Sequence, residues 1–229
     1  MTTLIVISPH LDDGVFGCGR LLAGRPGGVV LTVFAGTPPD GGCSTEWDQR
    51  CGFDCARDAM AARRREDDAA LTLLQARPVR LPFCDSQYGE TPSREDLQRA
   101  LREALTGLAP EAVLYPMGLF HADHVLVHEA TRAALSTLRG AQSWLYEDAL
   151  YRGLRGLMQQ RLADFARDGL VATPLRLGGD DAYAALKRSA VHAYRSQLQG
   201  FGPTAYADAE QAERYWRLEP AGGGDVMAP

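Results

Sequence analysis

Short apolar runs alternate with longer amphipathic stretches along most of the chain. The runs are β-branched and almost continuously apolar, as in strands buried on both faces, whereas the stretches place apolar residues at helical spacing. We predict five strands, at Leu4–Ile7, Val29–Phe34, Val79–Phe83, Ala112–Pro116 and Trp144–Glu147. We predict helices at Gly14–Leu22, Ala56–Gln75, Ser93–Leu108 with Ser93 as N-cap, Ala122–Leu138, Leu154–Asp168 and Ala182–Gln199.

Strands that alternate with helices of this length favour a mostly parallel sheet with right-handed crossovers. We therefore expect a single α/β, Rossmann-like domain over residues 1–220 and a disordered Gly-rich tail over 221–229. The segment Ala35–Asp54 has no periodic pattern and is rich in Gly, Pro, Asp and Cys. Long irregular loops in compact domains are usually functional or mobile, so we expect this one to form part of a pocket.

Net charge and hydropathy exclude some classes of function. The formal net charge is −5, which argues against a nucleic-acid partner because phosphate binding needs a basic surface. No apolar run approaches the ~18 residues that a membrane span requires. No basic segment precedes the first apolar run, as it would in a secretory signal, so we expect a cytoplasmic protein.

The chain has five cysteines, an odd number that argues against a disulfide framework. Cys43, Cys51 and Cys55 lie together in the irregular loop. A structural zinc site there is disfavoured because no Cys-x-x-Cys pair and no nearby histidine completes four ligands. A single loop disulfide and free thiols remain as alternatives.

Two groups of polar residues follow predicted strands. His10, Asp12 and Asp13 come after the first strand, and His121-Ala122-Asp123-His124 comes after the fourth. Sites in parallel α/β sheets form beyond the carboxyl ends of the strands, which is where both groups would lie. Because histidine is the commonest metal ligand among side chains, this arrangement suggests a metal site.

The neighbouring carboxylates of Asp12 and Asp13 would repel each other and would be costly to bury without a cation. If Asp13 binds a metal, Asp12 is left beside the water molecule that the metal activates, where a general base belongs. The alternative is that Asp12 or Asp13 only caps the following helix.

In the second group, one histidine can bind the metal while the other faces the substrate as an acid or an electrostatic stabiliser. Asp123 can accept a proton from a histidine ring and fix its tautomer. His128 lies four residues after His124, so a two-histidine helix pair is also conceivable, although a surface or half-buried role is favoured. We interpret His192 as structural. Two histidines and one aspartate make a zinc site with an open position, suited to amide or ester hydrolysis.

Pro9–Asp13 and His121–His124, about a hundred residues apart, resemble the PIG-L/LmbE-like deacetylases, which are zinc-dependent N-deacetylases with a Rossmann-like core. Arg64–Ala70 and Lys187–Gln197 resemble two helices of that family, and Asp85 follows the third strand as a family active-site aspartate does. The resemblance implies that His10, Asp13 and His124 bind Zn²⁺.

The resemblance further implies that Asp12 is the general base and that His121, oriented by Asp123, stabilises the oxyanion. Asp85 would contact the substrate. Leu11 stands where the family usually has proline and Gly14 where it has glutamate, which suggests a side branch with its own substrate.

We therefore expect removal of an N-acetyl group from an amino sugar of the N-acetylglucosaminyl type, or from its conjugate, and leave self-association open. One alternative is an amidase or esterase that acts on a larger acyl conjugate. Another is a Rossmann-like nucleotide- or sugar-binding module, for which the G-x-x-G-x-G spacing of Gly14–Gly19 is a poor match. Trp47, Tyr88 and Phe120 could form a platform for a sugar ring, although such aromatic residues more often pack.

Overall fold

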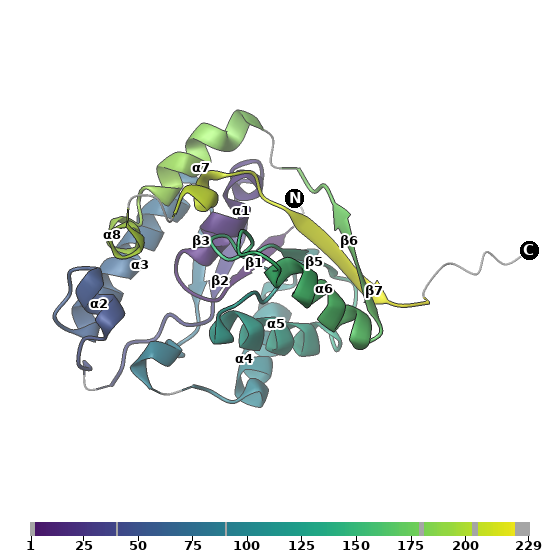
Figure 1. The fold of residues 1–229 in the computed structure, drawn as a ribbon, viewed down its shortest axis with the longest axis horizontal. Coiled ribbons are helices and arrows are strands. Elements are labelled where there is room, and N and C mark those ends of the chain that lie inside the picture. Colours follow the sequence, from purple (N-terminus) through teal and green to yellow (C-terminus); the bar gives the residue numbers. More distant parts are fainter. Residues whose placement is uncertain (1–2, 40, 90, 179–180, 203–205, 223–229) are drawn as a thin grey trace, which may run out of the picture.

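A computed structural model describes residues 3–39, 41–89, 91–178, 181–202 and 206–222. Its seven strands form one sheet in the order β3-β2-β1-β4-β5-β7-β6 (Figure 1). The first five strands run parallel, β7 is antiparallel to β5, and β6 is antiparallel to β7. The predicted mostly parallel α/β fold is thus confirmed. The strands are β1 (Leu4–Ser8), β2 (Val29–Thr32), β3 (Arg77–Arg80), β4 (Ala112–Pro116), β5 (Gln142–Tyr146), β6 (Leu170–Leu175) and β7 (Tyr215–Pro220).

Helices cover both faces of the sheet, which explains why the central strands are apolar throughout. Leu4 and Val6 of β1 face one core and Ile5 and Ile7 face the other, because successive side chains of a strand point to opposite faces. The first core is covered by α1 (Asp13–Ala23), α3 (Ala56–Leu73) and α7 (Ala184–Val191). The second is covered by α4 (Arg94–Leu108), α5 (Ala122–Leu135) and α6 (Leu157–Arg167).

Two strands were not predicted, and a third has different bounds from the predicted ones. β6 and β7 form the outer part of the sheet and are partly exposed, so they lack a continuous apolar run. β3 begins at Arg77 rather than Val79, also with exposed residues. β2 ends at Thr32, but the chain continues along β1, since the Val33 and Phe34 backbone N–H groups donate to the carbonyls of Ser8 and Pro9.

The predicted last helix is two helices, α7 and α8 (Arg195–Phe201). The break lies at Tyr194, which leaves the helical conformation at ψ 58° and donates its buried hydroxyl to Asp67 Oδ1 at 2.9 Å. The irregular loop contains a short helix, α2 (Glu46–Arg50), which begins with a capping box formed by Thr45 and Asp48. Figure 1 places α2 and α8 side by side, and they are in contact.

The structure also bears on the loop cysteines, the tail and membrane insertion. Cys43 pairs with Cys55 in an isolated antiparallel bridge, but no disulfide joins them. At the start of the predicted tail, the Ala221 N–H donates to the Gly169 carbonyl, and residues 223–229 lie outside the described part. None of the helices in the described ranges is long and apolar enough to cross a membrane.

Candidate active site

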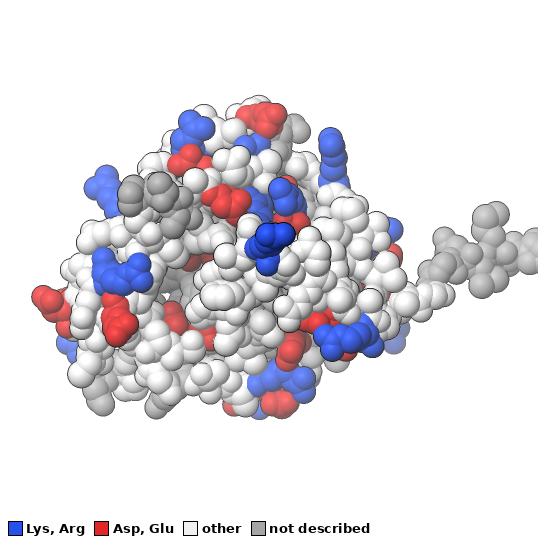
Figure 2. Space-filling view, viewed as in Figure 1, with Lys and Arg blue, Asp and Glu red and all other residues white. Residues whose placement is uncertain are grey.

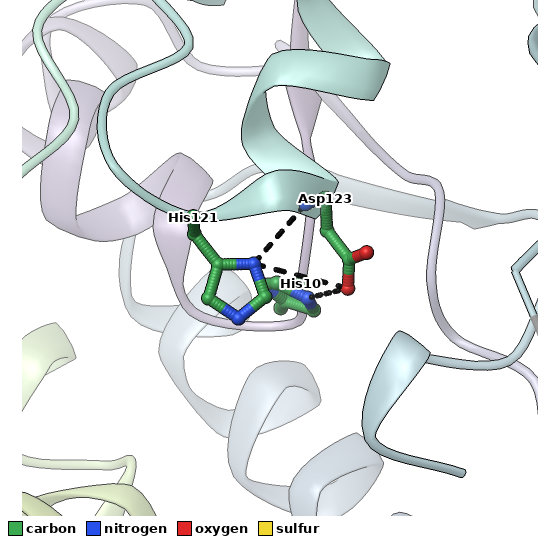
Figure 3. Close-up of side chains that lie close together, drawn as sticks. All are labelled: His10, His121 and Asp123. Atoms are coloured by element: carbon green, nitrogen blue, oxygen red, sulfur yellow. Dashed lines mark hydrogen bonds and ion pairs between the residues drawn. The ribbon is translucent and has the colours of Figure 1, made fainter. Parts of the chain in front are cut away.

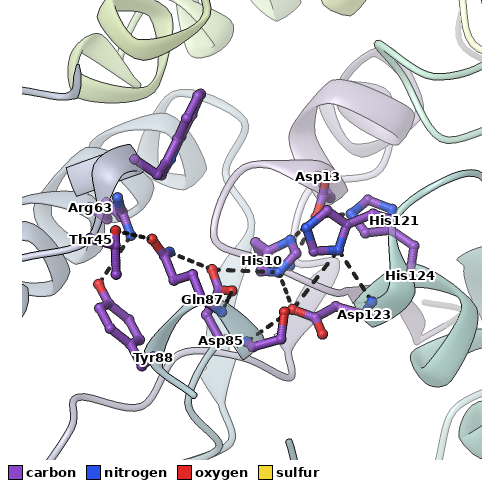
Figure 4. A network of polar contacts seen from close by, with 12 residues as sticks. His10, Asp13, Thr45, Arg63, Asp85, Gln87, Tyr88, His121, Asp123 and His124 are labelled. Carbon is purple, nitrogen blue, oxygen red and sulfur yellow. Dashed lines mark hydrogen bonds and ion pairs between the residues drawn. The ribbon is translucent and has the colours of Figure 1, made fainter. Parts of the chain in front are cut away.

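The two polar groups meet at the carboxyl edge of β1 and β4 (Figure 4). Residues 10–13 form the turn between β1 and the start of α1, and residues 121–124 form the start of α5, with His121 at its N-cap. The crossover topology of a parallel sheet places both turns at this edge. Their side chains are therefore brought together although they lie more than a hundred residues apart in the chain.

Asp13 stands between two histidines. Its Oδ2 accepts the backbone N–H of His10 at 2.9 Å and lies 3.1 Å from His10 Nδ1 and 3.2 Å from His124 Nε2. The potential ligand atoms of these three residues all lie within 4.8 Å of one another. Two imidazoles and one carboxylate form the donor set of a catalytic zinc site that keeps an open position.

A second group, made of His10, His121 and Asp123, meets the same distance criterion. His10 belongs to both groups but turns Nδ1 toward Asp13 and Nε2 toward Asp123 Oδ2, at 3.1 Å (Figure 3). His121 Nδ1 lies 3.9 Å from that oxygen and already accepts the Asp123 backbone N–H at 3.2 Å. Because its lone pair is used in this way, His121 is the weaker candidate for a metal ligand.

Buried carboxylates support both histidines of the first group. His124 Nδ1 lies 2.6 Å from Asp148 Oδ1, and His10 Nε2 faces Asp123, which also accepts the Ser86 N–H at 3.2 Å. Metal-binding histidines almost always donate their other ring N–H to such a partner. This outer support favours His10, Asp13 and His124 as the metal-binding group.

The electrostatics of the group also suit a cation. Burial by itself would lower the pKa of His124, but Asp13 and Asp148 outweigh it and raise that pKa to about 9. Burial would raise the pKa of Asp13, yet His124 and His10 hold it well below the usual range. In the metal-free protein, protons on the histidines therefore supply the positive charge that a divalent ion would otherwise bring.

Asp12 occupies the N-cap position of α1, but its side chain makes no capping hydrogen bond. The backbone N–H of Gly14 is instead satisfied by Ser8 Oγ at 2.7 Å. Asp12 lines the cavity, and burial, followed by the charge of Asp13, raises its pKa to about 7. A carboxylate with a pKa near neutrality is suited to accept a proton and return it.

His121 is half-buried and also lines the cavity. Because its Nδ1 accepts the Asp123 N–H, the neutral ring carries its proton on Nε2. Burial, and then His10, lower the pKa of His121, so the ring is neutral at pH 7. The contact differs in detail from the expected one, since the backbone N–H of Asp123 orients His121 while its carboxylate lies nearer His10.

The cavity beside these residues has a volume of about 270 Å³. Its far wall comes from α2 and α8, where the Trp47 and Phe201 rings lie 4.9 Å apart and Trp47 Nε1 donates to Gln197 Oε1 at 3.1 Å. The irregular loop therefore contributes to the cavity, as expected. The face in Figure 2 is hollowed between the α2–α8 side and the α5–α6 side, and acidic residues are visible inside the hollow.

Asp85 lies at the cavity wall, with Oδ2 3.7 Å from His10 Nε2. It is not free, because it accepts both the backbone and the side-chain N–H of Gln87, at 3.0 and 2.7 Å.

His128 is fully buried rather than half-buried and donates from Nδ1 to the Pro116 carbonyl at 2.9 Å. His192 is partly exposed and pairs with Glu210, away from the cavity.

Several residues of the site went unrecognised in the sequence, among them Asp148, Tyr151 and Gln197. Asp148 carried a usable signal, since it follows a predicted strand just as residues 10–13 and 121–124 do. Tyr151 and Gln197 carried none, because irregular and helical segments bring them to the cavity only through packing.

The glycines of α1 are not a phosphate-binding loop. A Cβ added at Gly17 would lie 2.5 Å from the Tyr146 ring, and one at Gly19 would lie 2.9 Å from Lys187. Both glycines sit within the helix and permit close packing of the sheet and of α7. The nucleotide-binding alternative therefore loses the motif on which it was based.

Known proteins resemble the chain over most of its length. The 2'-N-acetylparomamine deacetylase of Streptomyces fradiae is 28% identical over 262 residues, covering 95% of this chain and 90% of that protein. The structure of A40926 pseudoaglycone deacetylase superposes with a TM-score of 0.77 at 28% identity, covering 97% of this chain and 99% of that one. The zinc inhibited form of teicoplanin deacetylase gives a TM-score of 0.79 at 22% identity, covering 97% and 100%, and supports the fold alone.

A family match covers the region that carries both polar groups. Residues 5–135 match PIG-L, described as GlcNAc-PI de-N-acetylase, and this stretch runs from β1 to the end of α5. It includes His10, Asp13 and His124, so the family match and the geometry of the site coincide. The chain belongs to the PIG-L family.

Proposed function

We propose that this protein is a zinc-dependent N-deacetylase that hydrolyses the N-acetyl group of an amino sugar or its conjugate. The observation that carries the proposal is the grouping of His10, Asp13 and His124 around one point, with Asp12 beside it and not engaged in capping. Two relatives with 28% identity are deacetylases of 2'-N-acetylparomamine and of an antibiotic pseudoaglycone, which supports a conjugated sugar as the substrate.

His10, Asp13 and His124 would hold the metal. When bound there, a divalent ion supplies Lewis acidity, which activates water and polarises the amide carbonyl. Asp12 takes a proton from the attacking water and then delivers it to the departing amine, a dual task that its raised pKa favours. His121 donates from Nε2 to the oxygen that becomes negative in the tetrahedral intermediate, as its neutral tautomer allows.

The same site would serve an amidase or esterase that acts on a larger acyl group. The cavity volume of about 270 Å³ lies just below the ~300–1,000 Å³ of sites for drug-sized ligands, which favours a small acyl group such as acetyl. The substrate is then an N-acetylated small molecule. The cytoplasmic location expected from the sequence stays a prediction.

Metal analysis and kinetics test the proposal together. Purified wild-type protein should contain about one zinc ion per chain, and the double variant His10→Ala/His124→Ala should contain almost none. Asp12→Asn should retain the metal while deacetylation of N-acetylglucosaminyl conjugates falls by about 10²- to 10⁴-fold, the usual contribution of a general base. Unchanged zinc content in the double variant, or normal turnover by Asp12→Asn, would contradict the proposal.

A further inference from the structure

Phe120 is unusually exposed for an aromatic residue beside a catalytic group. It exposes 67% of its surface and immediately precedes His121. Its ring lies 5.3 Å from that of Tyr151, which lines the cavity and in turn contacts the rings of His121 and His124. The exposed ring is therefore continuous with the cavity wall through Tyr151.

The backbone at Phe120 is also strained. Its φ is +60°, and the His121 N–H donates to the Leu119 carbonyl at 2.7 Å, which makes Phe120 the central residue of a γ-turn. This turn with positive φ is rare and strained for a residue that has a Cβ, whereas glycine adopts it freely. The turn itself orients His121, but it does not require a phenyl ring. Strained backbone of this kind clusters at active sites and ligand clamps, so the exposure and the strain together point to contact with a ligand.

The size of the cavity indicates which part of a sugar conjugate lies inside it and which part lies outside. At about 270 Å³, the cavity can enclose a group of sugar size but not a larger conjugate. The remainder of a conjugate must extend out of the cavity. Trp47, Phe201 and Tyr151 line the cavity, and Phe120 adjoins it through its contact with the Tyr151 ring. A phenyl ring offers no hydrogen bond, so it contributes affinity by packing against an apolar face, and a pair of aromatic rings gains more than its buried area alone provides.

We propose that Phe120 and Tyr151 form a stacking subsite for an aromatic aglycone attached to the N-acetylated sugar. The subsite rests on the proposed function, since it assumes that the sugar occupies the cavity beside His10, Asp13 and His124. Stacking of one ring pair corresponds to roughly a two- to tenfold change in affinity, to which burial of the exposed ring adds.

Binding of two glycosides tests the subsite. The 4-nitrophenyl and methyl glycosides of N-acetylglucosamine differ in the aglycone and share the sugar. Their dissociation constants are measured by calorimetry with zinc-loaded protein in an Asp12→Asn background, which slows turnover. Phe120→Gly keeps the γ-turn and removes the ring. The preference for the aryl glycoside should fall about tenfold in this variant, while its melting temperature should stay equal or rise because the strain is relieved.

The matched control is Leu73→Ala, which removes another exposed apolar side chain (41%, against 67% for Phe120). Leu73 lies at the end of α3, before the start of β3 and so at the opposite edge of the sheet. It should leave the aryl preference unchanged. An aryl preference that is equal with and without Phe120 overturns the inference, as does failure of the aryl glycoside to bind. If wild-type protein deacetylates neither glycoside but the preference depends on Phe120, the subsite stands and the proposed reaction fails.

Discussion

Asp148 is a buried carboxylate whose three side-chain hydrogen bonds within the described residues all reach the segments that carry the site. Oδ1 faces His124 Nδ1, and Oδ2 accepts the backbone N–H groups of Gly118 and Leu119 at 2.9 and 3.0 Å. These two residues belong to the segment that leads to His121. One side chain thus holds the tautomer of a proposed metal ligand and the backbone that presents the proposed oxyanion donor.

Asp148→Asn should weaken zinc binding by about 10- to 100-fold. If the oxygen of the new amide still accepts the two backbone N–H groups, the NH₂ group of the amide faces His124 Nδ1. This forces the proton of the His124 ring onto Nε2, which is the proposed ligand atom. Competition with a chromophoric chelator measures the affinity. Glu147→Gln is the control, since this adjacent buried carboxylate bonds instead to Trp216 and Arg214. Equal zinc affinity of Asp148→Asn and wild type would refute the role.

His128 should make the metal-free protein lose stability in acid. Burial, with the nearby Arg161 charge, lowers its pKa to about 3, against 6.5 for an unperturbed histidine. Between these values the unfolded chain binds the extra proton, so this contribution is full above pH 6.5 and falls by about 1.4 kcal/mol per pH unit as the pH drops toward 3.

Urea unfolding at pH 7 and pH 4.5 measures this loss. His128→Asn keeps a donor for the Pro116 carbonyl and should show a shallower fall in unfolding free energy over that interval. His192→Asn, at a partly exposed position, should retain the wild-type slope. Identical slopes for His128→Asn and wild type would show that His128 does not titrate in this way.

At the scale of elements, α1 depends on a glycine at its contact with the sheet. The Tyr146 ring lies against Gly17, and its hydroxyl donates to the Ile7 carbonyl at 2.8 Å, at the end of β1. Tyr146 is fully buried and its hydroxyl is held by this hydrogen bond, so moving the ring would disturb the surrounding core. Any side chain at position 17 pushes α1 away from β1, and with it the turn that carries residues 10–13.

Gly17→Ala should therefore destabilise the protein by about 1–3 kcal/mol despite the better helix propensity of alanine. Gly107→Ala, in α4, meets no atom within 4 Å and should stabilise by roughly 0.5–1 kcal/mol. Chemical denaturation measures the unfolding free energies of both variants. If the two substitutions shift the unfolding free energy in the same direction, the packing argument is wrong.

The elements that could be predicted are those with strong local patterns. β1 and β4 were foreseen because they are buried on both faces, and α4 because it has a Ser93 cap and an apolar stripe. β6 and β7 were missed because an outer antiparallel pair needs only one partly apolar face. Helix periodicity continues through residues 192–194, so the break between α7 and α8 was invisible without Asp67 as the partner of Tyr194.

At the scale of the whole molecule, a buried lysine joins both ends of the described chain. Lys187 of α7 donates from Nζ to the carbonyls of Phe16 and Gln211 at 2.9 Å and lies 2.8 Å from Glu213 Oε1. Both side chains of the ion pair are almost fully buried, at 0% and 1% exposure. Through these contacts, Lys187 links the segment before β7 to Phe16 of α1, the helix that follows the turn with residues 10–13.

Lys187→Met should cost about 3–5 kcal/mol, because it leaves the Glu213 carboxylate buried without its cation. Adding Glu213→Gln should recover part of that loss by removing the uncompensated charge. Arg217→Met breaks the exposed pair with Glu219 and should change stability by less than about 1 kcal/mol. Urea unfolding measures all three, and a double variant no more stable than Lys187→Met would contradict this account.

The sequence by itself determined the central parallel sheet and the edge at which the chemistry lies. Buried strands, helical stripes and the polar residues after two strands are local patterns, and parallel topology makes those strand ends meet. Only the tertiary structure decided which ring nitrogen faces which carboxylate, that Asp148 supports His124, and that α2 and α8 close the cavity. These contacts join residues far apart in the chain, and packing rather than local spacing sets their distances.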